Sequence, residues 1–154
     1  MTMAHLRHFA AGMALLAMLG ASPATAASSE DAIRDTLARW TDDFNAGRAD
    51  RVCDLFVPEL RYDYRGFPER GYRDICDLLH GSLSDPQRRF AYALDIKEII
   101  VSGDFAAVRL IWTLTAVTRN PPASARTQEY GIDLFRRQAD GSWKIIRYLA
   151  YEAP

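Results

Sequence analysis

Acidic residues on segments of alternating polarity are the first candidates for chemistry in this chain. Asp63, Glu129 and Asp133 each lie in a stretch that predicts a β-strand. A carboxylate becomes a general base when burial or a neighbouring charge brings its pKa toward neutrality. These three residues are therefore the candidate catalytic groups.

Asp133 has a further interpretation, because Arg147 lies at a similar distance on the other side of a predicted turn. Asp140-Gly141 is typical of a hairpin turn, so Asp133 and Arg147 are expected on neighbouring strands. The pair is either an anchor for a ligand inside a pocket or an ion pair on the outer face, where it contributes little to stability.

Aromatic residues are concentrated on faces predicted to point inward. They either form ordinary core or line an apolar cavity in which the polar atoms of Tyr and Trp hold a ligand. The candidate ligand-binding residues are Trp40, Phe44, Tyr62, Tyr64, Tyr92 and Trp112.

The N-terminal segment reads as a secretory signal peptide. It has Arg7, an apolar run over residues 9–19 and a small-residue cleavage site at Ala24-Thr25-Ala26. We therefore expect residues 1–26 to be removed and residues 27–154 to form one domain, periplasmic or secreted. The apolar run is too short to span a bilayer comfortably, so no stable membrane anchor is expected after cleavage. A retained anchor is the alternative.

The two cysteines, Cys53 and Cys76, both lie in the expected mature domain. An even cysteine count in an exported chain favours a disulfide. A bond between these two cysteines would close a loop and stabilise the fold by roughly 3 kcal/mol. Two buried free thiols are the alternative. A reactive thiol is disfavoured, because no basic residue is evident beside either cysteine.

Composition excludes several classes of protein. The chain has 154 residues and a formal net charge of −1, without the long basic runs of a nucleic-acid binder. It lacks zinc-ligand spacing, a serine-hydrolase nucleophile motif and a glycine-rich phosphate loop. We therefore expect neither a metal nor a cofactor, a small-molecule ligand as partner, and no nucleic-acid partner.

The elements that must position these residues follow an α+β order, with helices before strands. Apolar residues at helical spacing predict helices over residues 28–45, 50–56 and 72–80, the last ending at His80-Gly81. Alternating polarity and turn signals predict strands over 60–64, 90–101, 105–118, 128–137 and 143–151.

Five short motifs occur in a recognisable order. They are WTDDFNAG at 40–47, LF at 55–56, RYDY at 61–64, VSGDFA at 101–106 and DGSWKI at 140–145. In order and spacing the chain resembles the NTF2-like superfamily, especially its SnoaL-like and DUF4440-like members, over about residues 29–151. The resemblance implies a cone in which three N-terminal helices pack on a strongly curved antiparallel β-sheet around an apolar pocket. It also implies a homodimer formed through the outer sheet face.

The superfamily's ketosteroid isomerases place a tyrosine on the first helix, a carboxylate base at the end of the first strand and an acid on a later strand. By resemblance these positions fall on Trp40, on Tyr64 with Asp63 one residue away, and near Glu129 or Tyr130. A shift of one residue turns a strand side chain to the other face. If Tyr62 and Tyr64 face inward, Asp63 faces outward and cannot be the base.

Three functions follow. The leading hypothesis is an exported domain that binds a small, largely apolar molecule in an aromatic-lined pocket, with catalysis left open. The alternative is an acid–base isomerase or cyclase, with Asp63, Glu129 or Asp133 as base and a Tyr or Trp as donor to the developing oxyanion. The second alternative is a non-catalytic dimerisation module. A carboxylate that points into the pocket beside Tyr or Trp donors would favour catalysis.

Overall fold

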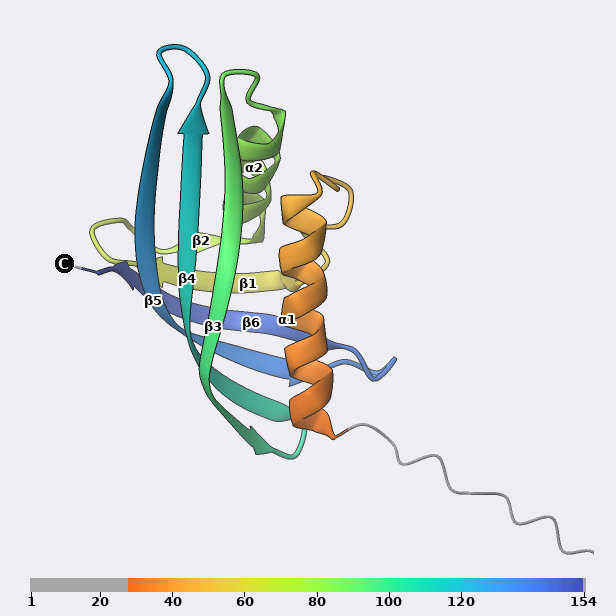
Figure 1. Ribbon diagram of the computed structural model, residues 1–154. Helices are drawn as coiled ribbons and strands as arrows, with labels where there is room; N and C mark the ends of the chain where they lie inside the picture. Colours follow the sequence, from red (N-terminus) through yellow and green to blue (C-terminus); the bar gives the residue numbers. More distant parts are fainter. Residues whose placement is uncertain (1–27, 154) are drawn as a thin grey trace, which may run out of the picture.

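The computed structural model describes residues 28–153 (Figure 1), so the predicted signal peptide lies outside the described residues. The described chain forms two helices and six strands. In order they are α1 (Ser29–Asn45), β1 (Phe56–Tyr64), β2 (Arg70–Gly71), α2 (Tyr72–Ser84), β3 (Arg88–Ser102), β4 (Phe105–Thr118), β5 (Ala123–Arg137) and β6 (Trp143–Glu152). The α+β class is therefore confirmed.

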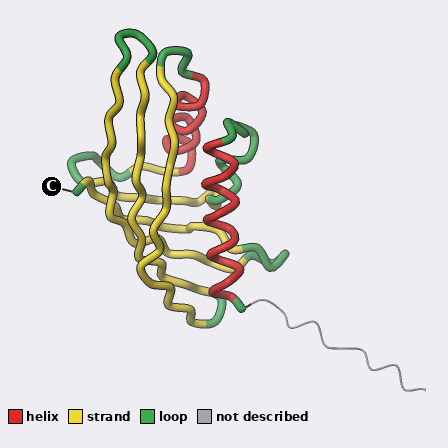
Figure 2. The backbone as a smooth tube through the Cα atoms, viewed as in Figure 1, coloured by secondary structure: helices red, strands yellow, loops and turns green. Residues whose placement is uncertain are grey.

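All six strands form one curved, open sheet in the order β2-β1-β6-β5-β4-β3. Figures 1 and 2 show the long strands bending along their length, with α1 lying against the sheet. Neighbouring strands are antiparallel except β1 and β6, which run parallel. The expectation of a wholly antiparallel sheet is therefore wrong at this one junction, where the strand that follows α1 joins the last strand of the chain.

Helix α1 forms where the sequence predicts it. The Ser28 hydroxyl accepts a hydrogen bond from the Asp31 amide at 3.1 Å, which caps the helix start. One stripe of the helix is buried in the core: Ile33, Leu37, Trp40 and Phe44. No helix within residues 28–153 is both long and apolar enough to cross a membrane.

The predicted helix over residues 50–56 is absent, so two helices and not three pack on the sheet. Successive turns close with three-residue spacing instead, from the Asp54 amide to the Arg51 carbonyl and from the Phe56 amide to the Cys53 carbonyl. The Val52 carbonyl accepts the Trp40 indole N–H at 2.7 Å. A tertiary contact thus takes a carbonyl that a regular helix would use.

Helix α2 continues past the predicted end at His80-Gly81 to Ser84. Leu79 is buried and Leu83 packs against the core one turn later, so the apolar face of the helix extends beyond the glycine. Gly81 therefore lies inside the helix.

A bulge in β6 changes which of its residues face the core. Leu134 pairs with Arg147 and Phe135 with Ile145, which leaves Ile146 as an extra residue. Trp143 and Ile145 are buried before the bulge. After it the alternation is shifted by one residue, and Tyr148 and Ala150 take the inner face.

Candidate active site

A cavity of about 350 Å³ lies between the inner face of the sheet and the two helices. Five of the six aromatic residues predicted to bind a ligand line it: Trp40, Tyr62, Tyr64, Tyr92 and Trp112. Phe44 does not line the cavity. It is fully buried behind the wall and packs on Trp40 and Tyr92, with ring centroids 5.6 Å and 4.8 Å away.

The indole of Trp40 forms part of the wall without offering a donor to a ligand. Its N–H already donates to the Val52 carbonyl, and its ring packs edge-on against Trp112 at 5.1 Å. The first-helix position that matches the isomerase tyrosine is therefore apolar toward the cavity. Oxyanion donors have to come from other residues.

Two of the three candidate carboxylates point into the cavity. Glu129 and Asp133 lie on the same face of β5, with Gly131 between them, and both line the cavity. Asp133 is only 5% exposed. No hydrogen bond or ion pair joins its carboxyl group to another side chain within residues 28–153. Asp63 is exposed on the opposite face, where it pairs in register with Leu149. It therefore cannot act on a molecule in the cavity.

The surroundings of the two inner carboxyl groups raise the pKa of each to a value near neutral pH. Burial raises the pKa of Glu129 to about 7; the nearby Glu152 adds to the rise, and a hydrogen bond with Tyr64 opposes it. Burial, together with the charge of Glu129, raises the pKa of Asp133 to about 8. At neutral pH Glu129 is thus partly ionised, while Asp133 mostly keeps its proton. This is the division expected of a base and an acid that share one site.

Two tyrosines with hydroxyl groups follow Asp133 across the inner face, one on each of the next two strands. Tyr148 is the register partner of both Asp133 and Tyr62, and the Tyr62 and Tyr148 rings stack with centroids 4.3 Å apart. Burial raises the pKa of Tyr148, so its hydroxyl stays protonated. The Tyr62 hydroxyl is buried without a hydrogen-bond partner within the described chain. An unsatisfied buried hydroxyl is costly, and a polar ligand atom would satisfy it.

Neither interpretation of an Asp133–Arg147 pair is correct. Because of the bulge, Asp133 lies opposite Tyr148 and not opposite Arg147. Arg147 is exposed and donates to the carbonyls of Glu59 and Ile146.

Three further polar residues line the cavity without having been expected from the sequence: Arg70, Tyr148 and Glu152. Strict alternation along β6 from Trp143 places Tyr148 outside, so only knowledge of the bulge would have moved it inward. Arg70 lies on a strand of two residues, which is too short to show any alternation. Glu152 follows the predicted end of the last strand.

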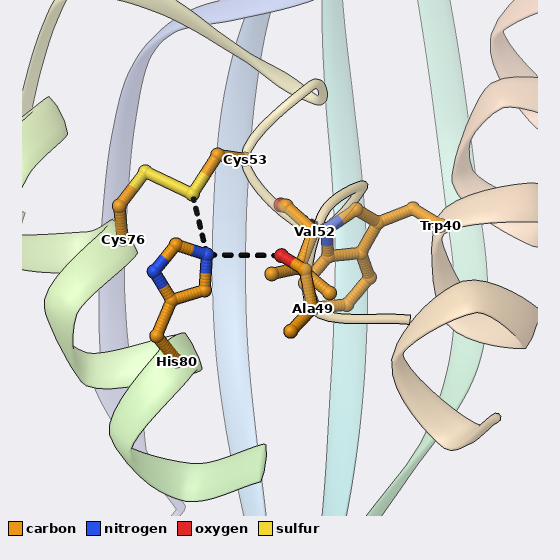
Figure 3. The surroundings of a disulfide bond; sticks show 6 residues. All are labelled: Trp40, Ala49, Val52, Cys53, Cys76 and His80. Atoms are coloured by element: carbon orange, nitrogen blue, oxygen red, sulfur yellow. Dashed lines mark hydrogen bonds between the residues drawn. A yellow bond between two sulfur atoms is a disulfide. The ribbon is translucent and has the colours of Figure 1, made fainter. Parts of the chain in front are cut away.

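The predicted disulfide between Cys53 and Cys76 is present (Figure 3). It joins α2 to the segment that carries Val52, the residue whose carbonyl holds Trp40. The bond therefore fastens two walls of the cavity to each other.

A histidine lies beside this bond, although its distance in the sequence from Cys53 gave no sign of the contact. His80, one helical turn after Cys76, places Nε2 3.7 Å from Cys53 Sγ and 2.9 Å from the Ala49 carbonyl oxygen. Within residues 28–153, no group of three or more His, Cys, Asp or Glu side chains is arranged to hold a metal ion.

Comparison with known proteins agrees with this architecture. A family model described as a SnoaL-like domain matches residues 37–148. A search of curated proteins finds no match.

Solved structures with the same architecture share little sequence with the chain. A conserved protein from Planctomyces limnophilus has a TM-score of 0.74 at 18% identity, covering 81% of this chain and 96% of that one. A ketosteroid isomerase-like protein from Erwinia carotovora has a TM-score of 0.65 at 21% identity, covering 80% and 96%. An NTF2-like superfamily protein from Salmonella enterica has a TM-score of 0.65 at 18% identity, covering 80% and 92%. The chain therefore belongs to the SnoaL-like domain family and has the NTF2-like fold.

Proposed function

We propose that the domain binds a small, largely apolar molecule in its cavity and moves a proton on it, with Glu129 as general base and Asp133 as proton-bearing partner. The observation that carries this proposal is the placement of both carboxyl groups on one strand face inside an aromatic cavity. Because their pKa values lie near 7 and near 8, the two groups differ in charge at neutral pH. Such a difference suits an acid–base pair.

The chemistry is abstraction of a proton from carbon next to a carbonyl group. Glu129 takes the proton, the electrons of the broken C–H bond form a carbon–carbon double bond, and the carbonyl oxygen gains negative charge. Protonated Asp133 and the unpartnered Tyr62 hydroxyl then donate hydrogen bonds to that oxygen. In a substrate with a carbon–carbon double bond in the β,γ position, return of the proton from Glu129 to the γ-carbon moves that double bond into conjugation and gives an isomer, with no oxidant or reductant required.

The similarity to the Erwinia ketosteroid isomerase-like protein supports this reaction class by analogy of fold. The fold by itself hosts many functions, so the carboxyl groups of this chain carry the proposal. Relative to the isomerase pattern, the base here lies on β5 and not at the end of β1.

Export is part of the same proposal. Residues 1–26 have the pattern of a signal peptide, and disulfides persist mainly in oxidising compartments. We infer that the domain acts in the periplasm or outside the cell.

Hydrogen–deuterium exchange tests the proposal without knowledge of the natural substrate. The cyclic ketone 2-tetralone is incubated with the protein in D₂O at pH 7.5, and loss of its α-proton signals is followed by NMR. We expect the protein to accelerate exchange and Glu129→Gln to lower the acceleration by about 10²–10⁴-fold. Glu98→Gln, which removes a carboxylate from the exposed outer face, is the matched control and keeps the wild-type rate.

Equal exchange in wild type and Glu129→Gln would refute the catalytic role. If 2-tetralone still bound, as measured by quenching of tryptophan fluorescence, the domain would be a binding module. Trp40 and Trp112 line the cavity and report such binding directly.

We also propose that two copies associate through the outer sheet face. Ile132 and Leu149 are register partners there and are 51% and 57% exposed. Beside them Tyr130 and Tyr151 stack on the same face with ring centroids 5.8 Å apart. An exposed apolar patch of this kind favours a protein contact. Because the cone encloses a cavity, dimerisation accompanies ligand binding in this proposal and does not replace it.

A further inference from the structure

Four polar side chains form one continuous row across four adjacent strands. Register pairs Arg70 of β2 with Tyr62 of β1, Tyr62 with Tyr148 of β6, and Tyr148 with Asp133 of β5. All four line the cavity. Since neighbouring strands lie about 4.8 Å apart, the backbones at the two ends of the row are roughly 14 Å apart.

The two ends of the row differ in charge. Asp133 at the inner end is buried, and its carboxyl group makes no hydrogen bond to another side chain within residues 28–153. Arg70 at the outer end is half-buried, with its guanidinium carbon 4.5 Å from the centroid of the Phe67 ring. No ion pair joins Arg70 to a carboxylate in the described chain. Phe67 thus orients a guanidinium group whose donors stay available at the cavity wall.

Other charges near the cavity lie off this row. Glu129 pairs in register with Glu152, and these two carboxylates form a separate, acidic edge of the cavity. An ammonium ligand would bind at that edge, whereas an anionic ligand would bind at Arg70. Tyr62 is the register partner of Arg70 and lies between Arg70 and Tyr148 in the row.

We propose that the ligand is an apolar carboxylic acid with a second oxygen function, aligned along this row with its carboxylate on Arg70 and its other oxygen toward Asp133. Arginine suits this role because its planar donor pair matches a carboxylate in two parallel hydrogen bonds. The proposal rests on the proposed function and adds the substrate class. It makes Arg70 the residue that selects for acids.

A matched series of three probes on one apolar skeleton tests this assignment: 2-naphthylacetic acid, its primary amide and 2-(2-naphthyl)ethylamine. Dissociation constants are measured by isothermal titration calorimetry at pH 7. We expect the acid to bind about tenfold more tightly than the amide, the size of one charge-assisted hydrogen-bonded contact, and the amine to bind most weakly.

Three variants test whether Arg70 is the residue responsible for the preference for the acid over the amide. Arg70→Gln should bind the acid and the amide equally, and Arg70→Lys should keep only part of the preference, because lysine cannot make the paired contact. Arg73→Gln, which removes an exposed charge three residues further along the chain, should keep the wild-type ratio. A melting curve for each variant shows that it is folded.

Several results would overturn the assignment: equal binding of acid and amide by the wild-type protein, tightest binding of the amine, or an unchanged preference in Arg70→Gln. Absence of binding by all three probes would also overturn it. The exchange of 2-tetralone, a neutral ketone without a carboxylate, reports on proton transfer separately. Failure of the carboxylate assignment is therefore distinguishable from failure of the proposed function.

Discussion

Carboxyl groups have opposite surroundings on the two faces of the sheet. On the outer face Asp95 forms an ion pair with Lys97, and Glu98 forms one with Arg109 at 3.6 Å. On the inner face Asp133 is buried and Glu129 is half-buried, and neither has a cation as an ion-pair partner within residues 28–153. Their pKa values rise to about 7 and about 8. Acidic residues on strands thus become acid–base groups or ordinary surface charges according to which way the pleat turns them.

This difference explains why a list of acidic residues finds candidates but cannot rank them. Asp63 follows Tyr62 directly in the chain, yet Tyr62 lines the cavity and Asp63 faces solvent. Loss of hydration is the largest cause of the pKa rise of both inner carboxyl groups, and it depends on the face to which the strand turns the side chain.

The largest effect that sharpens the comparison is the pH dependence of exchange. Below pH 7 Glu129 gains a proton and stops acting as a base, so we expect the rate at pH 5 to be about 50-fold lower than at pH 7. Above pH 8 the rate should fall again as Asp133 loses its proton. A rate measured by NMR that stayed constant from pH 5 to pH 7 would contradict the role of Glu129.

The next effect concerns the disulfide, which joins α2 to the segment that carries Val52 on the inner side of the sheet. Replacing both Cys53 and Cys76 by serine removes a constraint spanning 23 residues. We expect a loss of roughly 3 kcal/mol in the free energy of unfolding, measured with urea. The wild-type protein treated with a reductant should match the double variant; a midpoint unchanged by reduction would count against the prediction.

A smaller effect compares Asp133→Asn with Asp63→Asn by thermal unfolding. Between pH about 4 and pH about 8 the unfolded chain loses the proton of Asp133 while the native state keeps it, so rising pH lowers the stability of the wild type. Asparagine cannot ionise. We therefore expect Asp133→Asn to gain about 5 °C over the wild type at pH 8 and little at pH 5. Asp63→Asn should follow the wild type at both pH values, and an equal gain by the two variants would break the comparison.

The smallest effect belongs to the outer face. Leu149→Lys places a charge in the exposed apolar patch and should weaken self-association about tenfold, as measured by analytical ultracentrifugation. Binding of 2-naphthylacetic acid should not change, because Leu149 points away from the cavity. A variant that lost ligand binding while keeping its oligomeric state would contradict the division between the faces.

Local patterns predicted much of the fold. The apolar stripe of α1, its cap at Ser28 and the alternation along β4 are signals within one segment, and each element formed where it was expected. The segment 50–56 was assigned as a helix because a helical apolar pattern occurs there. Its carbonyl at Val52 is used instead by Trp40, which is a contact between segments.

Of the candidate site, the sequence supplied Glu129, Asp133 and five of the aromatic residues of the cavity. It did not supply Tyr148 or Arg70. Tyr148 depends on a one-residue bulge in β6, and such a bulge reverses every later side chain. The position of Arg70 at the cavity depends on the pairing of the two-residue strand β2 with β1, and so short a strand has no periodic pattern in the sequence.

The sequence by itself determined which residue types were available: inner-face aromatics, strand carboxylates, two cysteines and the order of helices before strands. These follow from composition and short-range periodicity, which act through neighbours in the chain. Only the tertiary structure decided that Asp133 faces Tyr148 and not Arg147, and that Arg70, Tyr62, Tyr148 and Asp133 form one row. The physical reason is that register between strands is set by hydrogen bonds between segments that are far apart in the chain, such as Phe56 and Ile145. A single extra residue in β6 changes that register without changing the local pattern.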